Sequence, residues 1–515
     1  MNRRHFLSSA TALAGFSAAT GLAQAQSPAA DFPALSPQTL GFGFDSLTAL
    51  ARERAAAPFQ APKATLTGSF ADLNYDQYRA IRFRREMDPW TEQDDFAVDL
   101  LPPGGLFSQP VKINLVVDGA ATPLDFSAQM LDFDPSQFPD GADLENVGNM
   151  GWSGFRIRTR LNRPDVMDEF LVFQGASYFR AVARNTLYGL SARGLAIGTG
   201  SPAGEEFPTF TDFWLHRPEP GADGVLIYAL LDSQSVAGAF EFYAVPGAET
   251  VLTTRLALFP RRDVRELGIA PLTSMFWFGP ANRSGVDDYR EAVHDSDGLQ
   301  MTTGAGQQLW RVLENHRNLQ MSAFMDRDPK GFGLIQRSRR FEDFQDAEAR
   351  YEKRPSAWIE PEGDWGEGVV SLVEIPVANE FNDNIVSFWR PKAGLKAGQR
   401  FDAAYRLVFA PLAVPQPPRA RIVQTRSGKS VNGRDSRSYV IDFDLRAFGD
   451  TDPEARVSAS AGVLGSAQVQ RLPEYGVMRL SFEFRPESAS LADISAVLNG
   501  PDGALSETWV ARWTL

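Results

Sequence analysis

Apolar and polar residues alternate along much of the chain, and this period of two predicts a protein built mainly of β-strands. Near the C-terminus, every second residue is apolar from Met478 to Phe484 and again from Trp509 to Leu515. One apolar face per strand is typical of an antiparallel sheet that covers a core. We therefore predict an all-β fold in which sheets pack face to face as sandwiches.

Turn residues mark where several of these strands end. Lys112–Val117 runs into Asp118-Gly119, a pair that favours tight hairpin turns. Val225–Leu231 and Ala239–Val245 flank a short polar segment, so we expect them to form a hairpin. Thr250–Leu258 follows as a further strand.

Only two segments have the apolar spacing of a helix. Residues Phe44–Ala56 place apolar side chains at helical intervals, with Asp45 as the expected N-terminal cap. Residues Phe341–Tyr351 place Phe341, Phe344 and Tyr351 on one face of a second predicted helix.

A proline-rich segment predicts the main division of the chain. Pro411–Pro418 has the sequence PLAVPQPP, which cannot form a central strand because proline lacks a backbone donor. We expect residues 26–410 to form a large β-sandwich, 411–418 a linker, and 419–515 a small immunoglobulin-like sandwich.

The N-terminus has the pattern of an export signal. Arg3-Arg4 precedes Phe6-Leu7 and a mildly apolar run, Ala10–Leu22, and Ala23–Ala25 fits a cleavage site. We predict a twin-arginine signal over residues 1–25 and a periplasmic location, with an ordinary secretory signal as the alternative. No later run is long enough for a membrane anchor.

Composition narrows the chemistry further. The net charge of −13 argues against nucleic acid as a partner. The chain has no cysteine and only four histidines, so we expect no thiolate or histidine-rich metal site and no cofactor. It has 37 Phe, 11 Tyr and 10 Trp, which suit broad β-cores and also sugar binding, because aromatic rings stack on the apolar faces of pyranoses. Export and aromatic content together point to a polysaccharide.

Familiar catalytic motifs do not fit. Gly198–Gly204 (GTGSPAG) has the wrong spacing for a dinucleotide-binding loop, and Gly151–Gly154 is not a nucleophile elbow. Asp295–Gly298 matches only the beginning of a calcium-binding loop.

Carboxylates remain as the candidate catalytic groups, since glycoside cleavage needs two of them. Val293–Gly298 combines two acids with a histidine. Tyr351–Trp389 places several acids among tryptophans and phenylalanines, where burial would raise a carboxyl pKa. These acids are Asp364, Glu374, Glu380 and Asp383. The alternative is that they cap turns and pair with Arg350, Arg354 and Arg390.

Long stretches of the chain resemble the periplasmic glucan biosynthesis family of Gram-negative bacteria, the glucans biosynthesis proteins G and D. The matching stretches are Tyr75–Phe83, Phe207–Pro218, Tyr228–Phe242, Leu267–Pro280, Asp288–Leu299, Glu348–Pro376 and Asn379–Trp389. The twin-arginine pattern favours the D-like branch.

The resemblance implies a large carbohydrate-enzyme β-sandwich joined to a small immunoglobulin-like domain. It also implies β-1,2-glucan as the substrate and partner, cleaved by an inverting endo-acting mechanism. Some relatives transfer the glucan chain and make cyclic products, so transglycosylation stays an alternative, as does a non-catalytic glucan-binding or scaffold role. The oligomeric state is left open, with a homodimer among the alternatives.

The family's two essential aspartates match Asp295 and Asp383. We expect Asp383 to be the general acid, acting through a water or a sugar hydroxyl, and Asp295 to be the general base. The resemblance places Glu380 and Tyr351 along the glucan cleft. Asp297 is the residue most easily confused with Asp295.

A basic, glycine-rich segment, Arg426–Arg437, matches a family loop that reaches over the cleft. Arg434 is the expected substrate contact there, and a solvated hairpin tip is the alternative interpretation.

Overall fold

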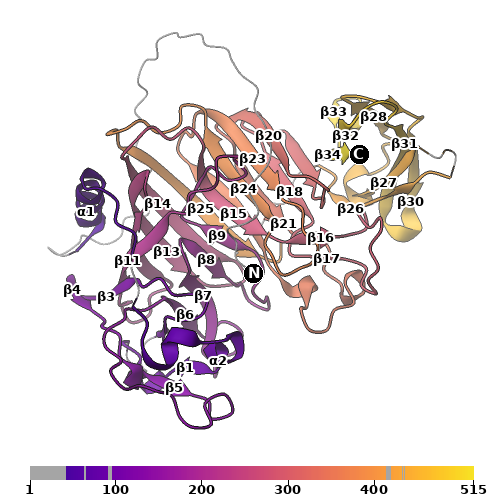
Figure 1. Cartoon of the computed structure of the whole chain (residues 1–515). Helices are drawn as coiled ribbons and strands as arrows, with labels where there is room; N and C mark the ends of the chain where they lie inside the picture. The colour runs from indigo at the N-terminus through magenta and orange to yellow at the C-terminus, as the bar shows by residue number, and fades with distance from the viewer. Residues whose placement is uncertain (1–41, 63–64, 91–94, 413–418, 432, 434) are drawn as a thin grey trace.

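The computed structural model describes residues 42–62, 65–90, 95–412, 419–431, 433 and 435–515. It is built almost entirely of β-strands (Figure 1), so the all-β prediction is confirmed. The α-helices described are α1 (Phe44–Ala56) and α2 (Tyr75–Arg79). Single 3-10 turns occur at Gly68–Asp72, Arg85–Met87, Ala128–Met130, Phe341–Asp343, Tyr351–Lys353, Leu445–Phe448 and Pro473–Tyr475.

One layer of the molecule is a 10-stranded sheet. In spatial order its strands are β2 (Phe96–Leu101), β6 (Gly154–Thr159), β7 (Asp168–Gln174), β8 (Tyr178–Ala181), β9 (Ser191–Arg193), β15 (Leu267–Ser274), β24 (Ile385–Pro391), β23 (Glu367–Glu374) and β20 (Gln320–Arg327), and β10 (Leu195–Ile197) also pairs with β15.

The facing layer belongs to a 15-stranded sheet. Its order is β28 (Glu454–Ala459), β32 (Leu491–Gly500), β34 (Thr508–Thr514), β19 (Gln308–Val312), β18 (Gly298–Thr302), β21 (Gly331–Ile335), β22 (Ser356–Glu362), β25 (Phe401–Ala410), β14 (Thr250–Pro260), β13 (Val236–Val245), β12 (Val225–Asp232), β11 (Thr209–His216), β3 (Lys112–Val117) and β4 (Ala120–Pro123), and β33 (Gly503–Ala504) pairs with β32.

Three smaller sheets complete the fold. A 5-stranded sheet contains β26 (Ile422–Lys429), β27 (Arg437–Asp444), β31 (Val477–Arg485), β29 (Val463–Leu464) and β30 (Gln468–Leu472). Two-stranded sheets pair β1 (Ile81–Phe83) with β5 (Leu131–Phe133) and β16 (Phe276–Phe278) with β17 (Val293–His294).

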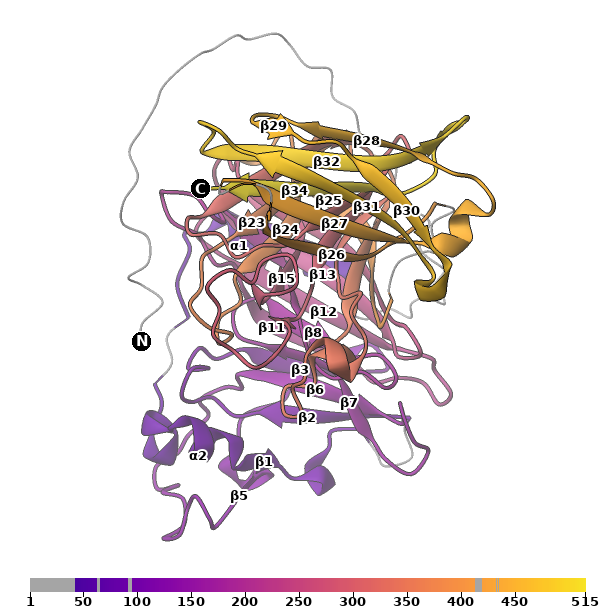
Figure 2. The same cartoon turned by 90° about the vertical axis from the view of Figure 1, so that its right-hand side faces the viewer.

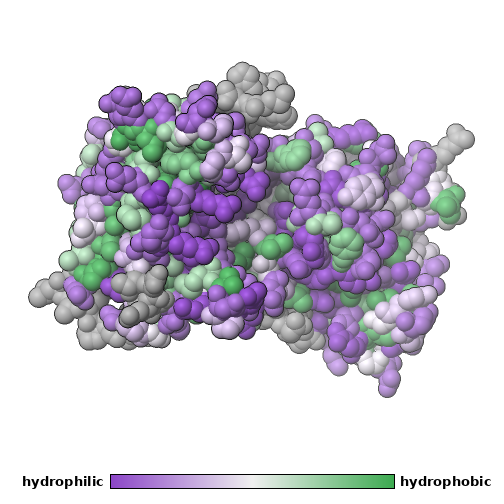
Figure 3. All heavy atoms as spheres, turned by 90° about the horizontal axis from the view of Figure 1, so that it is seen from below, coloured by the Kyte–Doolittle hydropathy of each residue, from purple (hydrophilic) through white to green (hydrophobic). Residues whose placement is uncertain are grey.

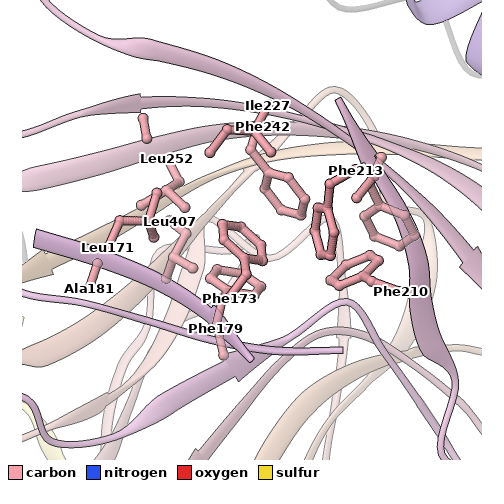
Figure 4. Close-up of a cluster of buried hydrophobic side chains, with 14 of the residues drawn as sticks. Leu171, Phe173, Phe179, Ala181, Phe210, Phe213, Ile227, Phe242, Leu252 and Leu407 are labelled. Atoms are coloured by element: carbon pink, nitrogen blue, oxygen red, sulfur yellow. The ribbon is translucent and has the colours of Figure 1, made fainter. Parts of the chain in front are cut away.

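Phenylalanines fill the space between the two large sheets (Figure 4). Phe173 and Phe179 of the 10-stranded sheet face Phe242 of the 15-stranded sheet, with ring centroids 5.3 Å apart in both pairs. All three rings are almost fully buried. Such offset and edge-on contacts add about 1 kcal/mol each to the burial of the rings. Part of the high phenylalanine content therefore stabilises this core.

Helix α1 packs on the outer side of the 15-stranded sheet (Figure 1). Its predicted bounds are confirmed, and its apolar residues Phe44, Leu47 and Ala51 cover Trp214 and neighbouring side chains. The predicted cap is wrong: Gly43 is the N-cap residue and makes no side-chain cap bond, while Asp45 lies in the first turn.

The helix predicted over Phe341–Tyr351 does not form. Gln345 and Arg350 have φ values of 61° and 48°, in the left-handed region that an α-helix cannot include. The chain makes short 3-10 turns at the two ends instead. Phe344 and Tyr351 are nevertheless buried in one cluster, so the apolar spacing reflected a packed loop.

The predicted strands are confirmed with small changes of length. The hairpin of β12 and β13 turns at Ser233–Ser235, and β3 ends at Asp118-Gly119, where both residues have positive φ. In β31 the alternate residues from Met478 to Phe484 face a core, whereas Leu515 lies beyond β34 and is exposed.

The C-terminal strands (gold and yellow in Figure 2) share a core with the end of the large sandwich. Strand β34 pairs in parallel with β19, so the 15-stranded sheet continues through both parts. Arg337 donates to the carbonyl of Ile422 at 2.6 Å and forms a buried ion pair with Glu507 at 2.8 Å. The linker prediction concerns residues 411–418, of which 413–418 lie outside the described part, and the domain boundaries stay a prediction.

The surface seen from below in Figure 3 is mainly hydrophilic, with small, separate hydrophobic patches. Within the described residues, no helix has the length and apolar character that a membrane span requires. The predicted signal at residues 1–25 lies outside the described part.

Candidate functional site

Hydrogen bonds and ring stacking fix the turn that carries Asp295. It follows β17, which pairs with β16. The backbone N–H of Asp295 donates to the carbonyl of Met275 at 2.8 Å, and the hydroxyls of Ser296 and Ser274 lie 2.9 Å apart. The ring of His294 stacks on Phe276 with centroids 5.3 Å apart. These contacts bury the turn and fix the direction of the Asp295 side chain.

Asp383 lies in the turn between β23 and β24, and the neighbouring Asn384 anchors this turn to the same segment. The Asn384 amide accepts from the backbone N–H of Phe276 at 2.8 Å and donates to its carbonyl at 3.0 Å. The Asn384 backbone N–H donates to the backbone carbonyl of Ser274 at 3.0 Å. Residues 274–276 therefore position both aspartates, which are 88 positions apart in the sequence.

Asp295 is a buried carboxylate with a charged partner. It is 3% exposed, and its Oδ1 lies 2.5 Å from Nη1 of Arg354. Burial raises the pKa of Asp295; the positive charge of Arg354 opposes this rise, and the negative charge of Asp383 adds to it. Both aspartates belong to one site because the turns that carry them are bonded to the same residues, 274–276. Asp295 is thus a buried carboxylate whose pKa is raised although a guanidinium is bonded to it.

Asp383 is more open than Asp295. Its side chain is 29% exposed, and its carboxylate lies 3.6 Å from Nη2 of Arg180. Arg180 is fixed by a 2.7 Å hydrogen bond from its Nε to the hydroxyl of Ser191. At 3.6 Å its contact with Asp383 is longer than a close hydrogen bond.

Tyr351 and Glu380 lie next to the two aspartates. Tyr351 is 2% exposed, and the guanidinium carbon of Arg354 lies 4.3 Å from its ring centroid. Burial raises the pKa of the Tyr351 hydroxyl, which therefore remains a hydrogen-bond donor. Glu380 forms a 2.6 Å ion pair with Arg290.

Arg290 organises the rim of the site. Besides Glu380 it pairs with Asp288 and Asp346, at 2.9 Å each. Its guanidinium also lies 5.9 Å from the ring of Trp277 and 6.0 Å from that of Tyr289. Four separate segments are therefore tied together around one arginine.

The other acids predicted from the sequence do not lie with the two aspartates. Asp297 faces away from the pair and accepts hydrogen bonds from the backbone N–H groups of Arg337 and Ser338, at 3.1 and 3.3 Å. Asp364 is exposed, and Glu374 is buried against Arg311 at 2.8 Å. Arg434 lies outside the described residues. The sequence thus predicted Asp295, Asp383, Glu380 and Tyr351, and the structure brings these four together.

Several residues that position the site were missed. Arg180, Arg290 and Asn384 were not named, and Arg354 was named only as a general partner for acids. Arg290, Arg354 and Asn384 fall inside the long stretches that resemble the family, which is the one signal that could have singled them out. Nothing local distinguishes Arg180, because its role depends on a strand pairing.

A small cavity of about 40 Å³ lies beside the turn that carries Asp295, at the junction with β26. Asp297 and His294 line it, together with Arg337 and residues 422–425. Asp295 does not line it, so this cavity is separate from the aspartate pair. Among the described residues, no group of three or more His, Asp or Glu side chains could hold a metal ion.

Comparison with known proteins agrees with the resemblance in sequence. The family model for "Periplasmic glucan biosynthesis protein, MdoG" matches residues 42–513. Glucans biosynthesis protein G of Rhodopseudomonas palustris (strain BisA53) is 47% identical over 472 residues, 90% of this chain and 92% of that protein.

Two further relatives carry the same name. Glucans biosynthesis protein G of Vibrio cholerae is 42% identical and covers 93% of this chain and 88% of its own length. That of Bradyrhizobium diazoefficiens is 42% identical over the full length of both. The D-like assignment rests on the N-terminal pattern alone and stays a prediction. The chain belongs to the periplasmic glucan biosynthesis protein (MdoG) family.

Proposed function

We propose that this protein is an endo-acting β-1,2-glucan hydrolase that works by inversion, with Asp383 as general acid and Asp295 as general base. The linkage and the reaction come from the resemblance of the sequence. The observation that carries the proposal is the pair itself: a buried, arginine-bonded carboxylate next to a half-open one, both fixed to residues 274–276. Two unequal carboxyl groups are what an inverting glycosidase requires.

Asp295 suits the role of base. A general base works best when its pKa approaches the working pH while it remains ionised. Burial raises the pKa of Asp295, and Arg354 opposes that rise and so favours the ionised form. In this role it would take a proton from the attacking water.

Asp383 suits the role of acid. It is open enough to reach solvent or a sugar hydroxyl. The arginine near it, at 3.6 Å, would stabilise the carboxylate that remains once the proton has passed to the leaving oxygen. The donation would run through a water or a sugar hydroxyl.

The test is incubation of the purified protein with linear β-1,2-glucan. Hydrolysis produces new reducing ends, and inversion produces the α-anomer first, which NMR detects. Intact glucan after prolonged incubation would overturn the enzymatic proposal and leave a binding or scaffold role.

A substrate with fluoride as the leaving group separates the acid from the base. Fluoride departs without strong help from an acid, so a β-1,2-gluco-oligosaccharyl fluoride should restore much of the activity of Asp383→Asn. It should restore little in Asp295→Asn, since water must still be activated. The reverse pattern would exchange the two roles.

Transglycosylation is the second candidate and uses the same two aspartates, with a sugar hydroxyl in place of water. Cyclic or rearranged glucans without new reducing ends would identify it. Either reaction would take place in the periplasm after twin-arginine export, for which accumulation of the folded precursor in cells lacking that pathway is the test.

A further inference from the structure

A rigid aromatic group lies beside the candidate site, on the outer face of the 10-stranded sheet. Alternate residues of a strand share a face, so Tyr178 and Arg180 point to the same side of β8, while Phe179 points into the core. Tyr178 pairs across to Arg193 on β9. Arg193 therefore lies on the same face as the arginine that contacts Asp383.

Arg193 is buried between two aromatic rings. It is 4% exposed, and its guanidinium carbon lies 4.9 Å from the ring centroid of Tyr178 and 5.8 Å from that of Phe207. Its Nε donates to the hydroxyl of Thr273 at 2.9 Å, and its Nη1 donates to the carboxylate of Glu205 at 2.6 Å. The cation is neutralised locally, so it orders the rings and does not attract a charged ligand.

The loop between β10 and β11 holds this arrangement in place. Thr199 donates to the same Glu205 oxygen as Arg193, at 2.6 Å. Gly200 packs so tightly that an added Cβ would lie 3.1 Å from Val373 and 3.3 Å from Met321. The GTGSPAG segment, which fits no nucleotide-binding motif, thus fixes Glu205, two residues before Phe207.

Phe207 is 51% exposed despite this rigid support. Half of a large apolar ring is left in water at a fixed position, where a ligand could cover it without further ordering of the side chain. Tyr178 is half-buried beside it. We call Tyr178, Arg193 and Phe207 the aromatic shelf.

The aromatic shelf is continuous with the candidate site. Arg180 contacts Asp383 and bonds to Ser191, which pairs with Thr273, and Thr273 accepts from Arg193. One step between same-face residues of a strand is about 7 Å. The shelf therefore lies within a few such steps of Asp383, a distance that a short run of sugars from one glucan chain can span.

We propose that the aromatic shelf is a distal glucosyl-binding subsite that receives the same glucan chain as the aspartate pair. This inference rests on the proposed function. The apolar face of a pyranose would stack on Phe207, and Tyr178 would border the same sugar. The shelf would thus add affinity only for chains long enough to reach it.

The experiment compares Phe207→Ala with Phe207→Trp. The control is Tyr475→Ala, an aromatic residue that is 74% exposed in the C-terminal turn Pro473–Tyr475. Affinity is measured by calorimetry, in an Asp295→Asn background, with β-1,2-gluco-oligosaccharides of increasing length. We expect Phe207→Ala to bind long chains about five- to tenfold more weakly and short chains unchanged. Phe207→Trp and the control should bind as the background protein does.

An equal loss at all lengths, or no loss at any length, would overturn the aromatic shelf. Length-dependent binding through Phe207 without any turnover by the unmodified protein would support the shelf and overturn the proposed hydrolysis. If the unmodified protein cleaves glucan, and its preference for long chains is the same in Phe207→Ala, the proposed hydrolysis is supported and the aromatic shelf is overturned.

Discussion

Two regions of this molecule bury carboxylates beside arginines, yet they differ in what they can do. In the candidate site, Asp295 is bonded to Arg354 and faces a half-open Asp383. At the junction with the C-terminal strands, Glu374 is bonded to Arg311 at 2.8 Å and lies 3.5 Å from His316. Glu374, Arg311 and His316 are each 1–2% exposed at the side chain, so no ligand can reach them.

The electrostatics of the two regions differ in the same way. Burial alone would raise the pKa of Glu374, but the charge of Arg311 and hydrogen bonds from His316 and the Glu314 backbone outweigh it and lower the pKa. In the candidate site burial outweighs Arg354, and the pKa of Asp295 rises. The opening at Asp383 is what separates the two regions, because the junction also holds a second carboxylate, Glu314, whose pKa burial raises.

The strongest test of this difference removes the charge of each aspartate. Asp295→Asn and Asp383→Asn should each lower turnover of β-1,2-glucan at least about a hundredfold, because general acid–base groups contribute on that scale. Their melting temperatures should stay nearly unchanged. Asp364→Asn, an exposed acid from the same stretch of sequence, is the matched control. Retained activity would remove the altered residue from the mechanism.

At the junction, removing the carboxylate charge of Glu374 should lower stability and leave turnover nearly unchanged. Glu374→Gln leaves Arg311 without its buried partner, so the free energy of unfolding should fall by about 3 kcal/mol. Denaturant unfolding measures this loss, and turnover of the remaining folded protein should be nearly unchanged. Glu360→Gln breaks a surface pair with Arg406 and should cost at most about 1 kcal/mol. An equal cost in both variants would contradict the comparison.

Arg354 should set the pH at which the candidate base works. Arg354→Met removes the charge that opposes the rise in the pKa of Asp295, so that pKa should rise further. A base is active only when ionised, and the acid limb of the activity profile should therefore move up by about 1 to 3 pH units. Arg354→Lys should restore part of the shift. Arg350→Met, which affects the neighbouring pair with Glu352, should leave the limb in place.

The smallest effect is expected at Glu314, the second carboxylate of the junction. Burial raises its pKa; Arg311, Arg437 and His316 oppose this rise, and Glu374 adds to it. A group whose pKa is raised on folding stabilises fully below its unfolded pKa, and this contribution is lost as pH rises. Glu314→Gln should therefore increase stability by about 1 kcal/mol at neutral pH. The gain should vanish below about pH 4.5, and a gain independent of pH would contradict the explanation.

Much of the fold follows from local pattern. Strands β12, β13 and β31 were predictable because period-two alternation reports directly which side chains face a core. Helix α1 was predictable because its apolar stripe meets one sheet face. The segment at 341–351 was not, since Phe344 and Tyr351 are buried by a loop whose φ values no apolar spacing encodes.

The sequence by itself determined the all-β class and the family, and it predicted four residues, Asp295, Asp383, Glu380 and Tyr351, that the structure places in the candidate site. Local composition did not distinguish Glu374 from Asp383, because both are acids among aromatic residues, and the family resemblance alone singled out Asp383. Only the tertiary structure decided that one is sealed against Arg311 while the other opens beside Asp295. Only the tertiary structure brought Arg180, Arg354 and residues 274–276 to the aspartates. These contacts join segments that are neighbours in the fold and distant in the chain.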